Sequence, residues 1–265
     1  MRQPRTPRPD LEPDADLERE EMEAMQREIA AAAIFEDDHD VAVGSLSNPL
    51  EAASSDRDRP EPPLVAGVDQ SFLLESERAL SAVVVMQAGE VVERVHAVTP
   101  LEIPYIPGLL AFREGGPILA ALEGLSTEPD LFLFDGSGRI HFRQAGIATH
   151  IGVVLDVPSV GIAKSLLCGE PRGDVDDLPA GTTVPIDANS RVDAPAGTVL
   201  GYAVQTRQYD SPDRAINPLY VSPGHRVGPE TAADGALELA TTYKLPEPIR
   251  LADAYADEAK RTLEE

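Results

Sequence analysis

The order of apolar segments along the chain constrains its fold more than any other feature of the sequence. Three segments of strand-like length and content follow one another. They span residues 65–73, 79–87 and 90–98. Ala88-Gly89 separates the last two and predicts a hairpin turn. Helical and strand-like segments then alternate, so we expect an α/β fold in which helices flank a mixed five-stranded sheet.

The remaining elements follow from the same apolar patterns. We expect further strands at 130–135, 158–163, 198–206 and 219–222. We expect helices at 108–125, 143–155, 230–242 and 251–263. Short apolar runs that are bounded by turn residues are typical of strands in the core of a sheet.

Residues 1–60 differ in composition from the rest of the chain. They carry sixteen acidic residues and seven arginines, a net charge of −9. One short helix fits residues 16–35, but its apolar stripe at Met22 and Ile29 is narrow, so the helix is marginal unless it docks. We therefore divide the chain into an acidic, mostly disordered N-terminal extension, residues 1–60, and a folded domain, residues 61–265.

The whole chain of 265 residues is strongly acidic. It has 46 acidic and 22 basic residues, a net charge of −24, and its only lysines are Lys164, Lys244 and Lys260. Taken alone, this charge argues against a protein that binds nucleic acid, because such proteins usually present a basic face. We interpret the acidity as adaptation of the surface to a cytosol of very high salt, where charge repulsion is screened. The alternative is a ligand such as a metal ion or a basic protein.

The sequence indicates a cytoplasmic protein that does not contact a membrane. A single cysteine, Cys168, fits a reducing compartment because it has no partner for an internal disulfide. No apolar run is long enough to span a bilayer. The N-terminus, which is rich in arginine and acids, lacks the apolar core of a signal peptide.

In two of the predicted strands an apolar run ends in an aspartate, at Asp69 and at Asp135. Carboxylates at strand ends face the crevice where such sheets bind ligands. A third acid, Glu114, falls on an early turn of the helix predicted after residue 108. Three acids at two strand ends and one helix fit a hard cation such as Mg²⁺, which prefers oxygen ligands. For each aspartate alone, an ordinary turn residue is the alternative.

The segment Pro104–Glu114 places an aromatic residue between two prolines. Because proline fixes its own φ and biases the preceding residue toward extended geometry, Tyr105 is held as a stiff wedge. Such a wedge beside an acidic group suits a protein that pries something apart and does metal chemistry next to it. A proline-rich turn ahead of an ordinary amphipathic helix is the alternative.

Five segments of the chain together resemble the endonuclease V family. They are Ala66–Asp69, Pro104–Glu114, Asp135–His141, Gly161–Gly169 and Val221–His225, in this order along the chain. The second and fourth segments are long and specific. The resemblance runs from about residue 65 to about residue 256 and leaves the N-terminal extension outside.

The resemblance implies a ribonuclease H-like fold and a metal-dependent active site. It implies that Asp69, Glu114 and Asp135 bind Mg²⁺, with Mn²⁺ as a substitute, and that the ion activates water and stabilises charge on phosphorus. It also implies that Lys164 neutralises the scissile phosphate and that His225 approaches the metal, where it orients water or binds the departing phosphate. A packed surface lysine and a structural turn histidine are the alternatives for these two residues.

The resemblance also implies how the substrate binds. Tyr105 matches the wedge, and unstacking a damaged or mismatched base costs less than unstacking a normal one. The resemblance places His141 close to the lesion pocket or the metal site. It gives the lining of the pocket as Leu110, Gly136, Gly146 and Ile147. One departure from the family pattern is Gln70, where an apolar residue is expected after the aspartate.

Together these features predict a monomeric DNA repair endonuclease. The resemblance implies that it recognises deoxyinosine in DNA and nicks the strand one nucleotide 3′ of the lesion, leaving a 3′-hydroxyl and a 5′-phosphate. An inosine-specific endoribonuclease is one alternative, since contacts to the ribose 2′-OH cannot be read from sequence. A lesion-binding module without catalytic activity is the other.

Overall fold

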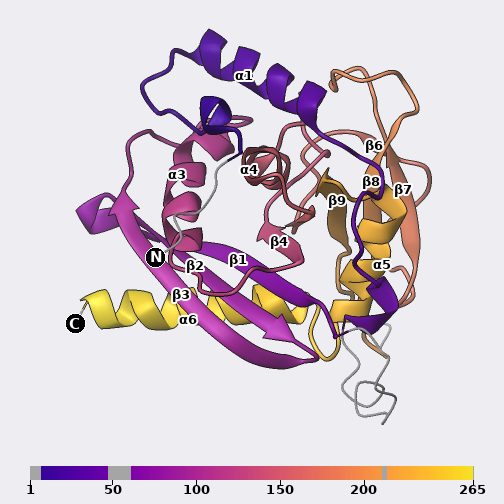
Figure 1. Cartoon of the computed structure of the whole chain (residues 1–265). Coiled ribbons are helices and arrows are strands. Elements are labelled where there is room, and N and C mark those ends of the chain that lie inside the picture. Colours follow the sequence, from indigo (N-terminus) through magenta and orange to yellow (C-terminus); the bar gives the residue numbers. More distant parts are fainter. Residues whose placement is uncertain (1–6, 47–60, 211–213, 265) are drawn as a thin grey trace.

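The strands pair into one twisted sheet that runs through the molecule (Figure 1). The computed structural model describes residues 7–46, 61–210 and 214–264. Within these residues the sheet has nine strands, in the order β3-β2-β1-β4-β5-β9-β8-β7-β6. The strands are β1 Leu64–Leu73, β2 Arg78–Gln87, β3 Glu90–Pro100, β4 Leu131–Asp135, β5 Ser159–Ala163, β6 Glu170–Pro171, β7 Thr183–Asp187, β8 Val199–Val204 and β9 Leu219–His225.

Helices lie on both faces of the sheet. The α-helices are α1 Arg19–Ala32, α3 Leu110–Leu122, α4 Ile147–Leu155, α5 Pro229–Leu239 and α6 Glu247–Glu264. Short 3₁₀ helices form at η1 Pro9–Leu11, η2 Val43–Ser45 and η3 Leu74–Ser76. Among the described residues, no helix has the length and apolar character needed to cross a membrane.

The first five strands of the order match the predicted mixed sheet. β1, β2 and β3 form an antiparallel meander, whereas β4 is parallel to β1 and β5 is parallel to β4. Ala88 and Gly89 have φ values of 51° and 81°, and this pair of positive values confirms the hairpin turn. The predicted α/β class with helices around a mixed sheet is confirmed.

The prediction that the sheet has five strands is wrong, because β9 continues the sheet beyond β5. β9 pairs antiparallel with β5, and β8, β7 and β6 follow in turn. β7 escaped the pattern because it is short and mostly half-buried and contains Pro185. β6 has only two residues, too few for any periodic signal.

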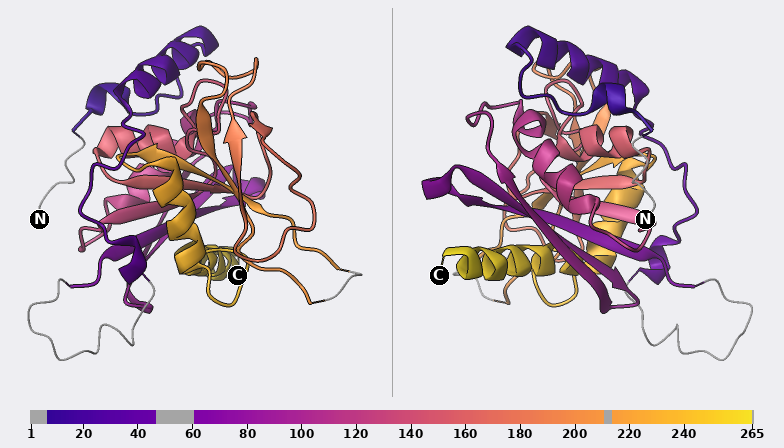
Figure 2. Two further views of the ribbon diagram at one scale, coloured as in Figure 1. Left: turned by 90° about the vertical axis from the view of Figure 1, so that its right-hand side faces the viewer. Right: turned by 60° about the vertical axis from the view of Figure 1, so that its left-hand side comes forward.

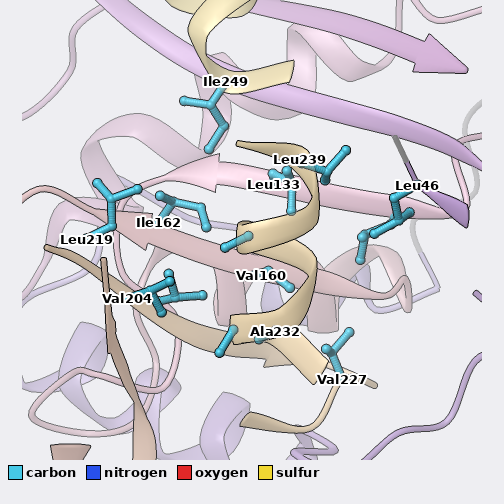
Figure 3. Close-up of a cluster of buried hydrophobic side chains, with 14 of the residues drawn as sticks. Leu46, Leu133, Val160, Ile162, Val204, Leu219, Val227, Ala232, Leu239 and Ile249 are labelled. Atoms are coloured by element: carbon cyan, nitrogen blue, oxygen red, sulfur yellow. The ribbon is translucent and has the colours of Figure 1, made fainter. Parts of the chain in front are cut away.

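Apolar side chains pack on both faces of the sheet. On one face, α3 and α4 cover β1, β2 and β4, and α1 lies beyond them. On the other face, α5 covers β4, β5 and β9, while α6 runs under β1 and β2 (Figure 2). Figure 3 shows Leu239 of α5 and Ile249 of α6 close to Leu133 and Ile162 of the sheet. Two apolar layers therefore hold the sheet, so its strand ends are firmly placed.

Strand alternation sets the direction of the two aspartates. Val68 and Phe134 belong to the apolar layer under α3 and α4. Successive side chains of a strand point to opposite faces. Asp69 and Asp135 each follow one of these residues, and so they turn toward the face that carries α6.

The expectation that the N-terminal extension is mostly disordered is wrong for residues 7–46. α1 begins with a capping box between Glu18 and Glu21, which satisfies backbone donors at its first turn. Its inner side buries Met22, Gln26 and Ile29 against the folded domain. Docking thus stabilises a helix that would be marginal alone. Residues 1–6 and 47–60, which the same expectation covered, lie outside the described part of the chain.

Candidate active site

Asp69, midway along β1, and Asp135, the last residue of β4, lie side by side where the parallel pairing of the two strands stops. Val68 of β1 pairs with Phe134 of β4, so the residues that follow them are neighbours on the two strands. The carboxyl group of Asp135 lies close enough to Asp69 for its charge to act on Asp69. Asp69 is buried, and the side chain of Asp135 is only 18% exposed. The fold therefore brings two acids together where little water reaches them.

This proximity makes the charged form of Asp69 unfavourable. Burial raises the pKa of Asp69 well above its ordinary value, and the neighbouring Asp135 raises it further. A divalent cation between two such carboxyl groups would relieve both effects, because it replaces lost hydration and cancels the like charges. The electrostatics of the pair therefore favour a bound cation.

Glu114 approaches this pair from α3. Its side chain is buried, and burial raises its pKa to about 7, against the opposing charge of Arg113 and with a further contribution from Asp135. The amide of Gln70 donates a 3.2 Å hydrogen bond to the Glu114 carbonyl oxygen. The polar residue after Asp69 thus ties β1 to α3, which explains why an apolar residue is not needed there.

Lys164 supplies a cation at the same edge of the sheet. It directly follows β5, and its Nζ donates a 2.6 Å hydrogen bond to Asp135 Oδ2. Partial burial lowers the pKa of Lys164, but the bond to Asp135 and the charges of Asp135, Asp69 and Asp253 outweigh burial and raise it. The lysine therefore stays charged, with its side chain 53% exposed.

Asp253 on α6 belongs to the same electrostatic neighbourhood, and the sequence analysis missed it. Its negative charge raises the pKa of both Asp69 and Lys164. α6 begins at Glu247, and a neighbouring residue, Ile249, packs into the core below the strands. Little in the sequence indicated that Asp253 belongs to the site, because an acid on an amphipathic helix is usually an exposed surface residue.

The donor set fits a hard divalent cation, although the three predicted ligands are not equally close. Among the described residues, no three His, Cys, Asp or Glu side chains are grouped tightly enough to hold a metal ion together. What the fold brings together is the pair Asp69 and Asp135, with Glu114 near enough to sense Asp135. Carboxylate oxygens are ligands that Mg²⁺ prefers, and Mg²⁺ commonly binds through one or two carboxylates plus water and substrate.

The Tyr105 side chain stands out from the surface. It is 63% exposed, an unusual position for a large aromatic ring. Ile103 and Ile106, on either side of it, pack instead against Leu109 and Phe112. The loop therefore has a buried base and an exposed tip, as the wedge hypothesis requires.

Sequence comparison decides the family. The family profile described as Endonuclease V matches residues 48–254 of this chain. The chain belongs to the endonuclease V family. The resemblance seen in the sequence segments is thereby confirmed, and the family consists of metal-dependent nucleases.

Individual relatives support the same assignment. An endonuclease V of Haloarcula marismortui is 59% identical over 97% of this chain and 98% of its own length. An endonuclease V of Gloeobacter violaceus is 43% identical over 73% of this chain and 74% of its own length. The first alignment reaches into the N-terminal extension, so the extension is shared with that relative.

Solved structures of the family have the same fold. The endonuclease V of Streptomyces avermitilis is 31% identical with a TM-score of 0.73, covering 94% of this chain and 95% of its own. The endonuclease V of Ciona intestinalis, in complex with DNA that contains an inosine followed by a ribo-adenosine, is 27% identical with a TM-score of 0.69. That comparison covers 92% of this chain and 98% of the Ciona chain.

The predicted pocket residues lie on two segments that meet. Gly136 has φ of 153°, and a Cβ there would lie 2.6 Å from Ile147 Cγ2, so only glycine allows this approach. The Gly146 amide donates a 3.0 Å hydrogen bond to the Gly138 carbonyl oxygen, which closes the loop between β4 and α4. Leu110 starts α3 directly after residues 101–109, the loop that carries Tyr105 and that we call the Tyr105 loop. Their role as a lesion pocket stays a prediction.

His141 is buried between these two segments. The backbone N–H of Arg143 donates to His141 Nδ1 at 3.2 Å, so the hydrogen of the ring is on Nε2, which donates to the Gly108 carbonyl oxygen at 3.1 Å. Burial lowers the pKa of His141 to about 4. At neutral pH it is an uncharged link between the Tyr105 loop and the predicted pocket.

The prediction that His225 approaches the metal site is wrong. His225 pairs with Ser159 at the start of β5, whereas Lys164 follows the end of that strand. Its Nδ1 accepts a hydrogen bond from the Ile34 backbone N–H, and its Nε2 donates to Asp156. The histidine therefore lies at the opposite end of β5 from Lys164 and fixes the N-terminal extension to the domain.

Proposed function

We propose that this protein is a Mg²⁺-dependent endodeoxyribonuclease that recognises deoxyinosine. In this proposal it nicks the strand one nucleotide 3′ of the lesion and leaves a 3′-hydroxyl and a 5′-phosphate. The observation that carries the proposal is the close pair of buried Asp69 and partly exposed Asp135, with Lys164 bonded to Asp135. The family assignment supports the nuclease activity.

Each side chain of this constellation has a distinct role in the proposal. Asp69 and Asp135 would hold the cation, with Glu114 beside them. A bound divalent cation supplies an activated water and neutralises charge that develops on the phosphoryl group. Lys164 is charged and half exposed, and in this role it contacts the scissile phosphate and shares its stabilisation.

The exposed ring of Tyr105 supports the recognition of damaged bases. Insertion of an aromatic ring opens the base stack, and a mismatched base leaves the stack at lower cost. The displaced base would meet main-chain groups near Gly136 and Gly146. Hypoxanthine differs from adenine at its six-position oxygen and its N1–H, and main-chain donors and acceptors distinguish such edges.

The distribution of lysines supports contact with a phosphate backbone, despite the net charge of −24. Lys164 lies at the acid pair, and its charge lowers the pKa of Lys244, after the larger effect of burial. Lys260 of α6 donates a 2.8 Å hydrogen bond to the carbonyl oxygen of Phe72, three residues beyond Asp69 on β1. The three lysines of the chain thus gather around one end of β1 and β5.

An inosine-specific endoribonuclease is the second candidate. The Ciona intestinalis relative was solved with DNA in which a ribo-adenosine follows the inosine. A ribonucleotide at that position supplies a 2′-OH next to the lesion, the group by which proteins distinguish RNA from DNA. Substrates with deoxyribose and with ribose next to the inosine should therefore both be tested.

A matched set of oligonucleotides tests the proposal. We would compare DNA, RNA, and DNA with one ribonucleotide 3′ of the inosine, each with an unmodified control, in Mg²⁺ and in chelator. The proposal expects a nick one nucleotide 3′ of inosine in DNA, in Mg²⁺ only. Cleavage confined to the ribose-containing strands would establish the ribonuclease instead. Binding of inosine strands without any cleavage would leave only a lesion-binding module.

A further inference from the structure

The backbone carbonyl group of Gly108 anchors the base of the Tyr105 loop through hydrogen bonds. The Gly108 carbonyl oxygen accepts two hydrogen bonds, from Gln26 Nε2 of α1 at 2.9 Å and from His141 Nε2 at 3.1 Å. Gly108 has φ of 81°, a value that turns the chain from the loop into α3 and that glycine adopts without strain. The anchor is thus placed at the junction between the wedge and the helix that carries Glu114.

Four residues close a ring of hydrogen bonds around this anchor. Gln26 and His141 both donate to Gly108, as described. Arg143 donates to both of them, through its Nη1 to Gln26 Oε1 at 3.0 Å and through its backbone N–H to His141 Nδ1. The ring joins the Tyr105 loop to the segment between Gly136 and Ile147, and Gln26 bridges its two sides.

The amide of Gln26 is matched to this position. It is fully buried, so an unpaired amide would carry its whole desolvation cost. Only one orientation satisfies both neighbours, because the Gly108 carbonyl requires a donor and the Arg143 guanidinium requires an acceptor. Glu23, one turn earlier on α1, holds the same guanidinium at 2.6 Å from Arg143 Nη2.

Apolar contacts support the same arrangement. Met22 of α1 is buried in a cluster with Leu109 and Phe112, and Ile103 and Ile106 of the Tyr105 loop pack against this cluster. α1 therefore contacts the base of the loop through both apolar and polar groups. The exposed tip at Tyr105 is free of these contacts and keeps its 63% exposure.

We propose that Gln26 is a positioning residue that fixes the Tyr105 wedge relative to the loop between β4 and α4, and so sets the preference for inosine over normal bases. The inference rests on the proposed function, since it assigns α1 a part in the same recognition. It gives the N-terminal extension a role in specificity in addition to covering α3 and α4.

Two substitutions isolate this role. Gln26→Met keeps the length and burial of the side chain but removes both hydrogen bonds. Gln26→Asn keeps the amide on a shorter side chain that cannot span both partners. Ile29→Ala is the matched control, because Ile29 is fully buried on α1 but packs with Leu11 and Val154, away from the ring.

The readout is the ratio of kcat/KM for an inosine strand to kcat/KM for the unmodified strand, measured beside thermal unfolding. The wild type must prefer inosine; if it does not, the proposed function itself fails. Loss of one buried, bridging amide lowers the ratio by about tenfold in Gln26→Met, mainly through KM for the inosine strand. In a Tyr105→Ala background the same substitution changes the ratio by less than about twofold, because Gln26 acts through the wedge.

Three results would overturn the inference, and they separate positioning from stability. One is an unchanged ratio in folded Gln26→Met or Gln26→Asn. Another is an equal loss in the Tyr105→Ala background. The third is an equal loss in Ile29→Ala at a similar fall in melting temperature. If Gln26→Met does not fold, Gln26→Asn is read by the same criteria.

Discussion

The carboxyl group of Asp135 lies so close to the buried carboxyl group of Asp69 that its charge raises the pKa of Asp69. They follow the last paired residues of the parallel strands β1 and β4, and the burial of Asp69 leaves few water molecules to separate their charges. Two acids in this arrangement cannot both ionise at low cost unless a cation joins them. The relationship between these two residues thus links the sheet topology to metal-dependent chemistry.

Substitution of Lys164 tests the phosphate contact. Lys164→Met should lower single-turnover cleavage of an inosine strand by about a hundredfold, the typical loss when one preorganised charged or hydrogen-bonding group at a transition state is removed. Binding of the strand should fall far less. Lys260→Met is the matched control, because Lys260 bonds only a backbone carbonyl at Phe72. Equal losses in the two variants would show that Lys164 contributes only general charge.

Removal of the Tyr105 ring tests the wedge. Tyr105→Ala should reduce the preference for inosine over normal duplex by roughly tenfold to a hundredfold, since base–aromatic stacking contributes about 1–3 kcal/mol. Cleavage of inosine in single strands should be affected less, because no partner strand has to be opened. The ring is 63% exposed, so its loss should leave the melting temperature unchanged. An unchanged preference in duplex would exclude the wedge role.

Glu93 of β3 should make the free energy of unfolding depend on pH. Burial raises the pKa of Glu93, but hydrogen bonds from the backbone and side chains of Ser126 and Thr127 outweigh it and lower the pKa to about 2. A pKa lowered in the folded state stabilises the protein above the unfolded value near 4.5, and this contribution is lost as pH falls toward 2. Glu93→Gln should therefore lower the free energy of unfolding at pH 7 by about 1 kcal/mol, discounted because the group is largely solvated.

Urea unfolding of wild type and Glu93→Gln at several pH values checks this effect. The difference between the two proteins should be full at pH 7 and shrink steadily below pH 4.5. A difference that stays constant down to pH 3 would mean that the hydrogen bonds survive without the charge.

The net charge of −24 predicts dependence on salt. We expect the protein to need molar salt to fold and work, because salt screens its own repulsion. Helicity by circular dichroism and cleavage activity should both rise from about 0.1 M to about 3 M KCl, as the Debye length falls from about 10 Å to below 3 Å. An ordinary nucleic-acid enzyme shows the reverse trend in affinity. Full structure and peak activity at the low-salt end would indicate another cause of the acidity, such as a basic partner.

The sequence predicted the positions of the two aspartates correctly but not the position of His225. The apolar runs that end at Asp69 and Asp135 predicted that both acids face one crevice, because such sheets bind ligands at the carboxyl ends of their strands. His225 was misplaced because β9 runs antiparallel to β5, so the end of β9 lies at the start of β5, away from Lys164. The direction in which two strands pair leaves no signal in the apolar pattern of either strand.

The composition of the N-terminal extension could not predict that it docks on the folded domain. α1 is acidic on its outer side, and its contacts with the domain include the buried amide of Gln26 and the ion pair between Glu23 and Arg143. Hydropathy scores such groups as solvent-exposed. Backbone contacts add to them, since the Leu11 carbonyl accepts from His150 and the Ile34 N–H donates to His225. None of these depends on a pattern that is visible along the chain.

The central claim is that the acid pair performs metal-dependent hydrolysis at inosine, and Asp135→Asn tests it most directly. The substitution keeps the size of the side chain but removes one of the two carboxylates that would hold the cation. Asp257→Asn on the exposed side of α6 is the control. We would measure single-turnover nicking and binding of one inosine strand across a Mg²⁺ titration. Asp135→Asn should bind the strand but not nick it at any Mg²⁺ concentration, while the control should nick like wild type. Nicking by Asp135→Asn at the wild-type rate would contradict the central claim.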